Sequence, residues 1–193
     1  MKKPKMTMRR GIGLGVCAVG VVASIVMKKQ DEGTAKYPLL YSAEAMEHLT
    51  GKWEGCRTKA YKDTGGLWTQ GIGHLCGKFQ PTEILTLEQV ADLFNEDLYK
   101  AEQCVLSKFN GNALTQGQRE ALTDFAFNVG CTKATVSGNG GMTKIRRYAL
   151  TGQYNAMCNE FLKWSLGRNT DGQLVRIQGL YNRRIDERNW CLK

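Results

Sequence analysis

Four side chains able to act as acids, bases or hydroxyl donors lie close together between residues 53 and 77: Glu54, Asp63, Thr69 and His74. Glycoside hydrolysis needs two carboxyl groups in unlike environments, one protonated to donate to the leaving oxygen and one ionised to assist water. Glu54 and Asp63 suit these two roles. The hydroxyl of Thr69 would then face Asp63, so that a water molecule is held between the two side chains.

A predicted helix must position Glu54. Apolar residues recur at helical spacing from residue 40 to residue 53, and Gly55 follows as a candidate C-cap. The negative end of the helix dipole, together with partial burial beside Trp53, should raise the pKa of Glu54 toward that of a general acid. Asp63 should stay ionised, because a solvated glycine turn follows it. Residues 57–73 are predicted to form the hairpin that carries this turn.

The rest of the chain is predicted to be helical. Thr86 with Gln89, and Thr115 with Gln118, match the capping box that opens a helix. The first of these helices should run to about residue 106 and the second should end at Gly130. A flexible, glycine-rich loop is expected over residues 132–141, and further helices over residues 142–150, 153–164 and 177–190. The fold class is therefore α+β, mostly helical, with a small β-hairpin lobe and a helical lobe.

The spacing of these residues closely resembles the T-even phage lysozyme family, glycoside hydrolase family 24. Glu54 precedes Asp63 by nine residues, Thr69 follows it by six, and the run closes on Gly71-Ile72-Gly73-His74-Leu75. Further similar stretches lie at residues 93–97, 127–130, 161–164 and 179–188. The resemblance covers about residues 39 to 191.

The resemblance implies a lysozyme-like fold and a muramidase that cleaves the β-1,4 bond between N-acetylmuramic acid and N-acetylglucosamine in peptidoglycan. It implies that Glu54 is the general acid, that Asp63 is the base or electrostatic stabiliser, and that Thr69 positions water for hydrolysis with inversion. Phe127 and Asn128 would line the cleft that binds the glycan. No cofactor and no metal are expected.

The N-terminal segment predicts a membrane function. Residues 1–29 carry seven basic and no acidic side chains, and residues 11–27 carry no charge. This length lies between a signal-peptide core and a comfortable bilayer span, and its glycines make insertion weak. The positive-inside rule places the N-terminus in the cytoplasm and the rest of the chain in the periplasm, tethered to the inner membrane. A cleaved signal with a poor site at residues 21–23 is the alternative.

The domain organisation follows from these segments. We expect a signal or anchor at residues 1–29, a polar linker at residues 30–38 and one catalytic domain at residues 39–193. The net charge of +9 does not indicate a nucleic-acid partner, because residues 30–140 carry 10 basic against 14 acidic side chains. Residues 141–193, with 10 basic against 4 acidic side chains, suit an anionic polymer such as the cell wall. A monomer is expected.

Seven cysteines raise the question of disulfides. Six follow the apolar segment and can form up to three bonds in an oxidising periplasm, which leaves Cys17 unpaired. The helical prediction brings Cys158 near Cys191, and Cys104 near Cys131. The N-terminus resembles the signal-anchor-release type of phage endolysin, some members of which rearrange a disulfide near the catalytic glutamate. That resemblance makes Cys17 and Cys56 redox candidates, although Asp63 at the aspartate position cannot itself be blocked by a disulfide.

Other residues have structural interpretations. The family resemblance pairs His74 with Asp97. The tryptophans are expected in the core, with Trp68 the best placed to contact sugar. The arginines at positions 183, 184 and 188 are expected to form a helix surface and a salt-bridge network, and not a site that binds a polymer. Two rival functions remain open, namely a lytic transglycosylase, which needs only the acidic residue, and a non-catalytic peptidoglycan-binding protein on the same scaffold.

Overall fold

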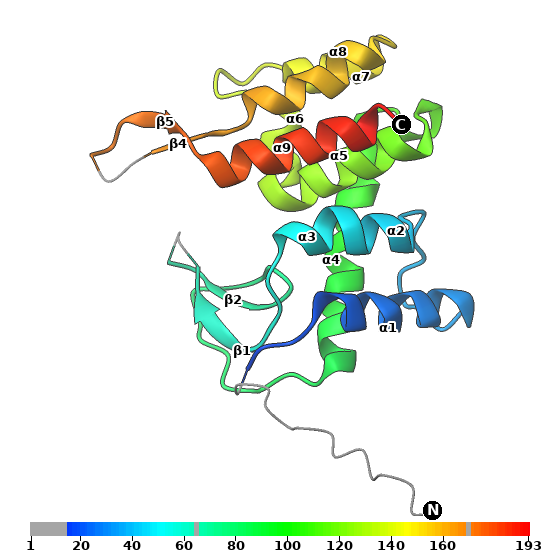
Figure 1. Ribbon diagram of the computed structural model, residues 1–193, viewed down its shortest axis with the longest axis vertical. Coiled ribbons are helices and arrows are strands. Elements are labelled where there is room, and N and C mark those ends of the chain that lie inside the picture. Colours follow the sequence, from blue (N-terminus) through cyan, green and yellow to red (C-terminus); the bar gives the residue numbers. More distant parts are fainter. Residues whose placement is uncertain (1–14, 64–65, 169–170) are drawn as a thin grey trace, which may run out of the picture.

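A computed structural model of the protein describes residues 15–63, 66–168 and 171–193. Its long central helix, α4 (Leu87–Lys108), connects two lobes: in Figure 1 one lobe flanks its lower part and the other lies at its upper end. The capping box predicted at Thr86 and Gln89 is present and opens this helix. The predicted mostly helical α+β fold is thereby confirmed.

The sheet lobe contains helix α1 and the segment that leads to Glu54. Its elements are α1 (Val19–Asp31), α2 (Ala43–Ala45), the π-helical turn η1 (Met46–Thr50), α3 (Gly51–Trp53), β1 (Arg57–Lys62), β2 (Trp68–Gly71) and β3 (His74–Gly77). The three strands form an antiparallel sheet in the order β1-β2-β3, in which Tyr61 is opposite Thr69. The predicted hairpin is thus the first part of a three-stranded sheet.

The helical lobe forms the other side of the molecule. Its elements are η2 (Gly111–Ala113), α5 (Gln116–Val129), α6 (Cys131–Thr135), α7 (Lys144–Leu150), α8 (Tyr154–Glu160), η3 (Phe161–Lys163), β4 (Leu166–Arg168), β5 (Leu174–Arg176) and α9 (Gln178–Cys191). The second capping box, at Thr115 and Gln118, opens α5. Strands β4 and β5 form a hairpin that sequence analysis did not predict, and Figure 1 shows it extending from the lobe.

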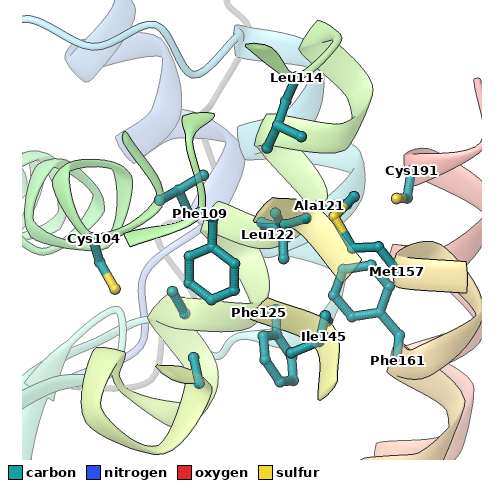
Figure 2. Packing of buried hydrophobic residues seen from close by; sticks show 14 of the residues in the cluster. Cys104, Phe109, Leu114, Ala121, Leu122, Phe125, Ile145, Met157, Phe161 and Cys191 are labelled. Atoms are coloured by element: carbon teal, nitrogen blue, oxygen red, sulfur yellow. The ribbon is translucent and has the colours of Figure 1, made fainter. Parts of the chain in front are cut away.

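An aromatic core fills the helical lobe (Figure 2). Phe125 packs edge-on against Phe161 and Trp164, with ring centroids 5.3 and 5.0 Å apart. Such arrangements match the positive ring edge to the negative ring face. Apolar residues of α5, α7, α8 and the C-terminal part of α4 surround these rings, so the core of this lobe comes from its own helices and from the connecting helix.

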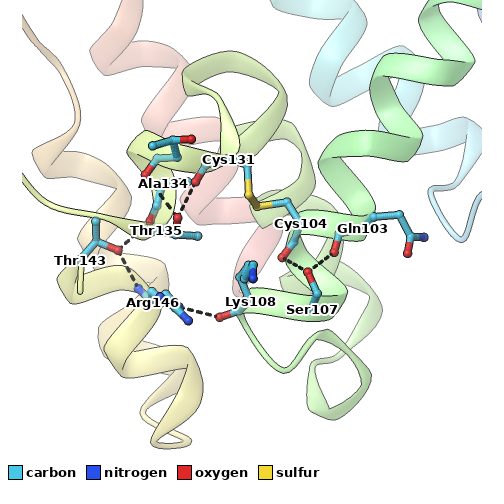
Figure 3. The surroundings of a disulfide bond; sticks show 10 residues. Gln103, Cys104, Ser107, Lys108, Cys131, Ala134, Thr135, Thr143 and Arg146 are labelled. Carbon is cyan, nitrogen blue, oxygen red and sulfur yellow. Dashed lines mark hydrogen bonds between the residues drawn. A yellow bond between two sulfur atoms is a disulfide. The ribbon is translucent and has the colours of Figure 1, made fainter. Parts of the chain in front are cut away.

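Two disulfides close the helical lobe, and they join the pairs that the sequence predicted. One joins Cys104 of α4 to Cys131 at the start of α6, as Figure 3 shows, and the other joins Cys158 to Cys191. The expected flexible loop at 132–141 is wrong in its first part, because α6 occupies Cys131–Thr135. Gly130, with φ of 84°, turns the chain into this helix, and the disulfide fixes the helix start.

Helix α1 packs on the sheet lobe. Its face of Val22, Ala23 and Val26 is buried in a cluster that includes Met46 and Phe94. Contacts run from α1 to α4 and to η1. The helix ends at Asp31, two residues inside the expected linker. Within the residues that the structure describes, no helix is long and apolar enough to cross a membrane; residues 11–14 of the predicted apolar segment lie outside this description.

The residues before α1 attach to the edge of strand β1. Cys17 forms a disulfide with Cys56, so the expectation that Cys17 is the unpaired thiol is wrong, and Cys76 is the free cysteine among the described residues. The amide of Cys17 donates to the Cys56 carbonyl at 3.0 Å, and the amide of Thr58 donates to the Gly15 carbonyl at 3.0 Å. These bonds extend the sheet by one short segment at its outer edge.

Candidate active site

A cleft of about 960 Å³ lies between the two lobes. Glu54, Asp63 and Thr69 line it from the sheet lobe, and Phe127 and Asn128 line it from α5. The structure therefore brings together the three residues proposed for the chemistry and two of the three proposed for binding. Lys133, Lys163 and Trp164 continue the lining along the helical lobe.

Glu54 follows the last turn of α3 in an extended conformation. Its amide still donates to the Thr50 carbonyl, at 3.1 Å, so the helix fixes its backbone. Its carboxylate accepts a bond of 2.5 Å from Nη1 of Arg183, and its side chain is 17% exposed. Gly73, with φ of 71°, brings the β2–β3 turn close to this carboxylate. The Cβ of any larger residue at position 73 would lie 3.5 Å from Glu54 Oε2.

Asp63 directly follows strand β1. Its carboxylate accepts a bond of 2.8 Å from the Leu67 amide, and its own amide donates to the Leu67 carbonyl at 2.9 Å. Thr69 is buried on β2, where its hydroxyl lies 3.4 Å from the Leu67 carbonyl. The turn thus holds Asp63 and Thr69 on neighbouring strands that face the cleft. Water positioning by this pair stays a prediction.

Of the proposed binding residues, Phe127 and Asn128 lie at the C-terminal end of α5. Phe127 packs edge-on against Phe94, with centroids 5.8 Å apart, and Asn128 accepts a bond of 2.5 Å from Nη2 of Arg184. Trp68 is not among the residues that line the cleft; Lys62 lies over its ring, 5.5 Å from the centroid. Trp164 packs against the core, as sequence analysis expected, and it also lines the cleft.

His74 and Asp97 form the contact that the resemblance implied. Nδ1 of His74 lies 2.7 Å from Asp97 Oδ2, and the bond joins β3 to α4. The hydrogen bond to Asp97 raises the pKa of His74 above its usual value, and desolvation opposes this only in part. Lys100 also contacts Asp97, at 3.6 Å. The pair lines a neighbouring cavity of about 360 Å³ that shares Phe127 with the cleft.

Two arginines expected on a helix surface are buried instead. Arg183 is 4% exposed and Arg184 is fully buried, so the expected surface position is wrong, whereas the expected salt-bridge network is present. Arg183 binds Asp124 of α5 through Nε and Nη2, at 3.2 and 2.9 Å. The position of Asp124 in the apolar stripe of α5 was the available signal, because a buried carboxylate requires a cationic partner. In the part of the chain described, no three His, Cys, Asp or Glu side chains gather as a metal site.

Comparison with known proteins places this geometry in a family. The phage lysozyme family model matches residues 51–187. A SAR-endolysin of Haemophilus phage HP1 is 31% identical over 182 residues, covering 92% of this chain and 94% of the relative. The crystal structure of the active form of the P1 phage endolysin Lyz superposes with a TM-score of 0.75 and 32% identity, covering 93% of this chain and 96% of that one.

A bacterial structure gives a further match. The muramidase domain of SpmX from Asticaccaulis excentricus is 25% identical, with a TM-score of 0.64. The match covers 80% of this chain and 98% of that domain. The similarity thus extends beyond phage proteins and includes a domain named for muramidase.

Proposed function

The chain belongs to the phage lysozyme family, and on that premise we propose that it is an endolysin that hydrolyses the glycan strands of peptidoglycan to lyse a bacterial host. It is a glycoside hydrolase, and its target is the β-1,4 bond between N-acetylmuramic acid and N-acetylglucosamine. One observation carries the proposal: Glu54, Asp63 and Thr69 line one face of a cleft whose other face contains Phe127 and Asn128.

In this mechanism Glu54 donates its proton to the glycosidic oxygen as the bond breaks. The enclosed position of its carboxyl, in a cleft between two lobes, keeps it close to the bound strand. The carboxylate of Asp63, held at its turn by the Leu67 amide, stabilises the positive charge that develops on the sugar ring. Thr69 and Asp63 hold the attacking water on the opposite side of the ring from Glu54, so the anomeric configuration inverts.

The products distinguish this reaction from its rivals. The full chain, incubated with purified peptidoglycan, should release new reducing ends, and proton NMR should first detect the inverted anomer. Anhydro-muramyl ends would instead establish a lytic transglycosylase, which cleaves the same bond without water. Binding to peptidoglycan without any new ends would establish a non-catalytic protein.

We also propose a membrane-tethered precursor. Residues 1–29 act as a signal and anchor, with residues 11–27 in the inner membrane, the N-terminus in the cytoplasm and the catalytic domain, residues 39–193, in the periplasm beyond the linker at 30–38. The relatives named SAR-endolysin support this proposal. So does the position of α1: three apolar residues that would leave the bilayer are buried against the sheet lobe.

The tether can be tested by raising the apolarity of the segment. Leucine at Gly13 and Gly20 should hold the segment in the membrane and delay lysis. Gly20 is suitable because nothing lies within 4 Å of an added Cβ, whereas Gly15, with φ of 107°, would strain the packed form. Gly20→Ser is the matched control and should lyse on the wild-type schedule. Unchanged timing in the leucine variant, or removal of the segment by signal peptidase, would contradict the proposal.

The released enzyme is proposed to act as a monomer on a polymeric substrate. Size-exclusion chromatography with light scattering should give the mass of a single chain. A stable dimer at assay concentrations would contradict this.

A further inference from the structure

Five charged side chains form one buried cluster behind the cleft. Asp124 on α5 and Glu187 on α9 have fully buried side chains, and so has Arg184, while Arg183 is 5% exposed. Glu54 completes the cluster at the cleft surface. The proposed reaction uses only Glu54 among these groups, so the role of the other four remains to be explained.

The two arginines each reach one residue of the cleft. Arg183 uses Nε and Nη2 for Asp124 and Nη1 for Glu54. Arg184 donates through Nη2 to Asn128. Neighbouring residues of α9 therefore hold the proposed acid and a proposed binding residue at the same time.

Glu187 lies between these two arginines. Its Oε1 is 3.4 Å from Nε of Arg183 and 3.2 Å from Nη2 of Arg184. Among the described residues, Nε and Nη1 of Arg184 and both carboxyl oxygens of Glu187 form no hydrogen bond, so Glu187 acts on the arginines through charge. Glu187 is consequently the carboxyl group that pairs with Arg184, and it can balance the charge of Arg184 when it is ionised.

The charge of the cluster requires one proton. Two arginines face three carboxyl groups, so the cluster is neutral when one carboxyl is protonated, and a buried net charge is costly. Burial raises the pKa of Glu187 well above its usual range, and Asp124 adds to this effect against the opposing charges of Arg184 and Arg183. Beyond these groups, Tyr41 lies near Asp124, with its hydroxyl 2.8 Å from that of Thr50.

We infer that Glu187 is a positioning residue for the reaction: it holds Arg183 and Arg184, and through them Glu54 and Asn128, and it shares with Glu54 the proton that keeps the buried cluster neutral. The inference rests on the proposed function. Protonation of Glu187 and protonation of Glu54 are alternative ways to balance the same arginines. A protonated, active Glu54 is therefore available without placing a net positive charge behind the cleft.

Replacing Glu187 with glutamine tests this. Glutamine cannot ionise, so protonation of Glu54 would leave an uncompensated positive charge. We expect the alkaline limb of the pH profile of kcat on purified peptidoglycan to shift to lower pH by about one unit. At a given pH on that limb, this shift is about a tenfold loss of kcat. KM should change little. Glu120→Gln is the matched control, because Glu120 is a buried carboxylate that binds Ser42 and Trp190 outside this cluster.

A second variant tests the charge balance directly. In Glu187→Gln combined with Arg184→Met, one cation is removed together with the missing carboxyl, so a protonated Glu54 again gives a neutral cluster. The alkaline limb should return toward the wild-type position, while KM rises because Asn128 has lost its donor. A purely structural role predicts no such recovery.

Two results would overturn the inference. One is a pH profile of kcat in Glu187→Gln that matches the wild-type profile. The other comes from carbon NMR of the full wild-type chain with labelled glutamate side chains, a measurement that needs no folded variant. The side chain of Glu187 should remain protonated at neutral pH. An ionised Glu187 carboxylate at that pH would refute the proton assignment. Wild-type protein without turnover would defeat the proposed function separately, and the NMR titration would still test Glu187.

Discussion

The sheet lobe and the helical lobe each contain a buried apolar cluster and a disulfide, but they are completed by different parts of the chain. The helical lobe closes on its own helices and is fixed by the Cys104–Cys131 and Cys158–Cys191 bonds. The sheet lobe takes Val22, Ala23 and Val26 from α1, and Cys17–Cys56 joins that segment to the chain two residues after Glu54.

This difference between the lobes predicts that the chemical step and substrate binding can be changed separately. The carboxyl groups proposed for the chemistry lie in the lobe that depends on α1, whereas most of the binding surface lies in the lobe that does not. Changes in the sheet lobe should therefore lower kcat, and changes to the cleft-lining residues of the helical lobe should mainly raise KM; the α9 cluster that contacts Glu54 is the exception. The four predictions that follow test this separation.

The largest effect is expected at Glu54. Glu54→Gln should lower kcat on permeabilised Gram-negative cells by about 10³-fold or more, because an amide cannot donate the proton that the leaving oxygen needs. Asp63→Asn should be severe too, and Thr69→Ala weaker. Exposed Glu47, in the helical turn before α3, offers the control Glu47→Gln, which should leave kcat unchanged. Turnover of Glu54→Gln near the wild-type rate would contradict the assignment of Glu54 as the general acid.

Disulfide removal should distinguish the lobes. The Cys17–Cys56 and Cys158–Cys191 bonds separate residues by 39 and 33 positions, so Cys17→Ser and Cys158→Ser should each lower the free energy of unfolding by about 3 kcal/mol. At denaturant concentrations well below the unfolding transition, only Cys17→Ser should reduce kcat, because it releases the chain beside Glu54 from its disulfide. Denaturant unfolding and kinetics on the same samples would check this. Equal kcat values in the two variants would contradict the separation.

Asn128→Ala should act on binding. The side chain lies in the cleft and contacts no group proposed for the chemistry, so KM should rise by about tenfold with kcat almost unchanged. Initial rates over a range of peptidoglycan concentrations separate the two constants. A fall in kcat alone would show that Asn128 contributes to the chemical step.

The smallest effect is expected for the pair that joins β3 to α4. The pKa of His74 is raised on folding, mainly by its hydrogen bond to Asp97, so the stabilisation is fully present below the unfolded pKa, about 6.5. It is lost as the pH rises through the folded pKa. His74→Asn should therefore cost about 1 kcal/mol in acid and less at alkaline pH. Urea unfolding at several pH values would check this, and a pH-independent cost would contradict it.

Local sequence signals predicted much of the fold. Both capping boxes start helices where expected, and the glycine-flanked run from Asp63 to His74 forms the strands that carry the proposed residues. The hairpin of β4 and β5 was missed although Asp171-Gly172, a favoured turn pair, lies between its strands. The cysteine count was misleading because it excluded Cys17 from pairing.

The buried arginines could not be predicted in the same way. A helix with several charged residues normally exposes them, and Arg183 is inside only because Asp124 and Glu54 meet it from 59 and 129 residues away. Local periodicity contains no information on partners at such distances. The family resemblance indicated that the arginines matter but not which carboxylates they bind.

The short segment bound along β1 has a consequence for solubility. Gly15 and Cys17 occupy hydrogen-bonding positions of β1 on the side opposite β2. Without them, Cys56 and Thr58 would present an open strand edge, and such an edge is a template for pairing with another chain. A form of the protein whose N-terminus is held elsewhere therefore carries a site for self-association into aggregates, and the return of residues 15–17 closes that site.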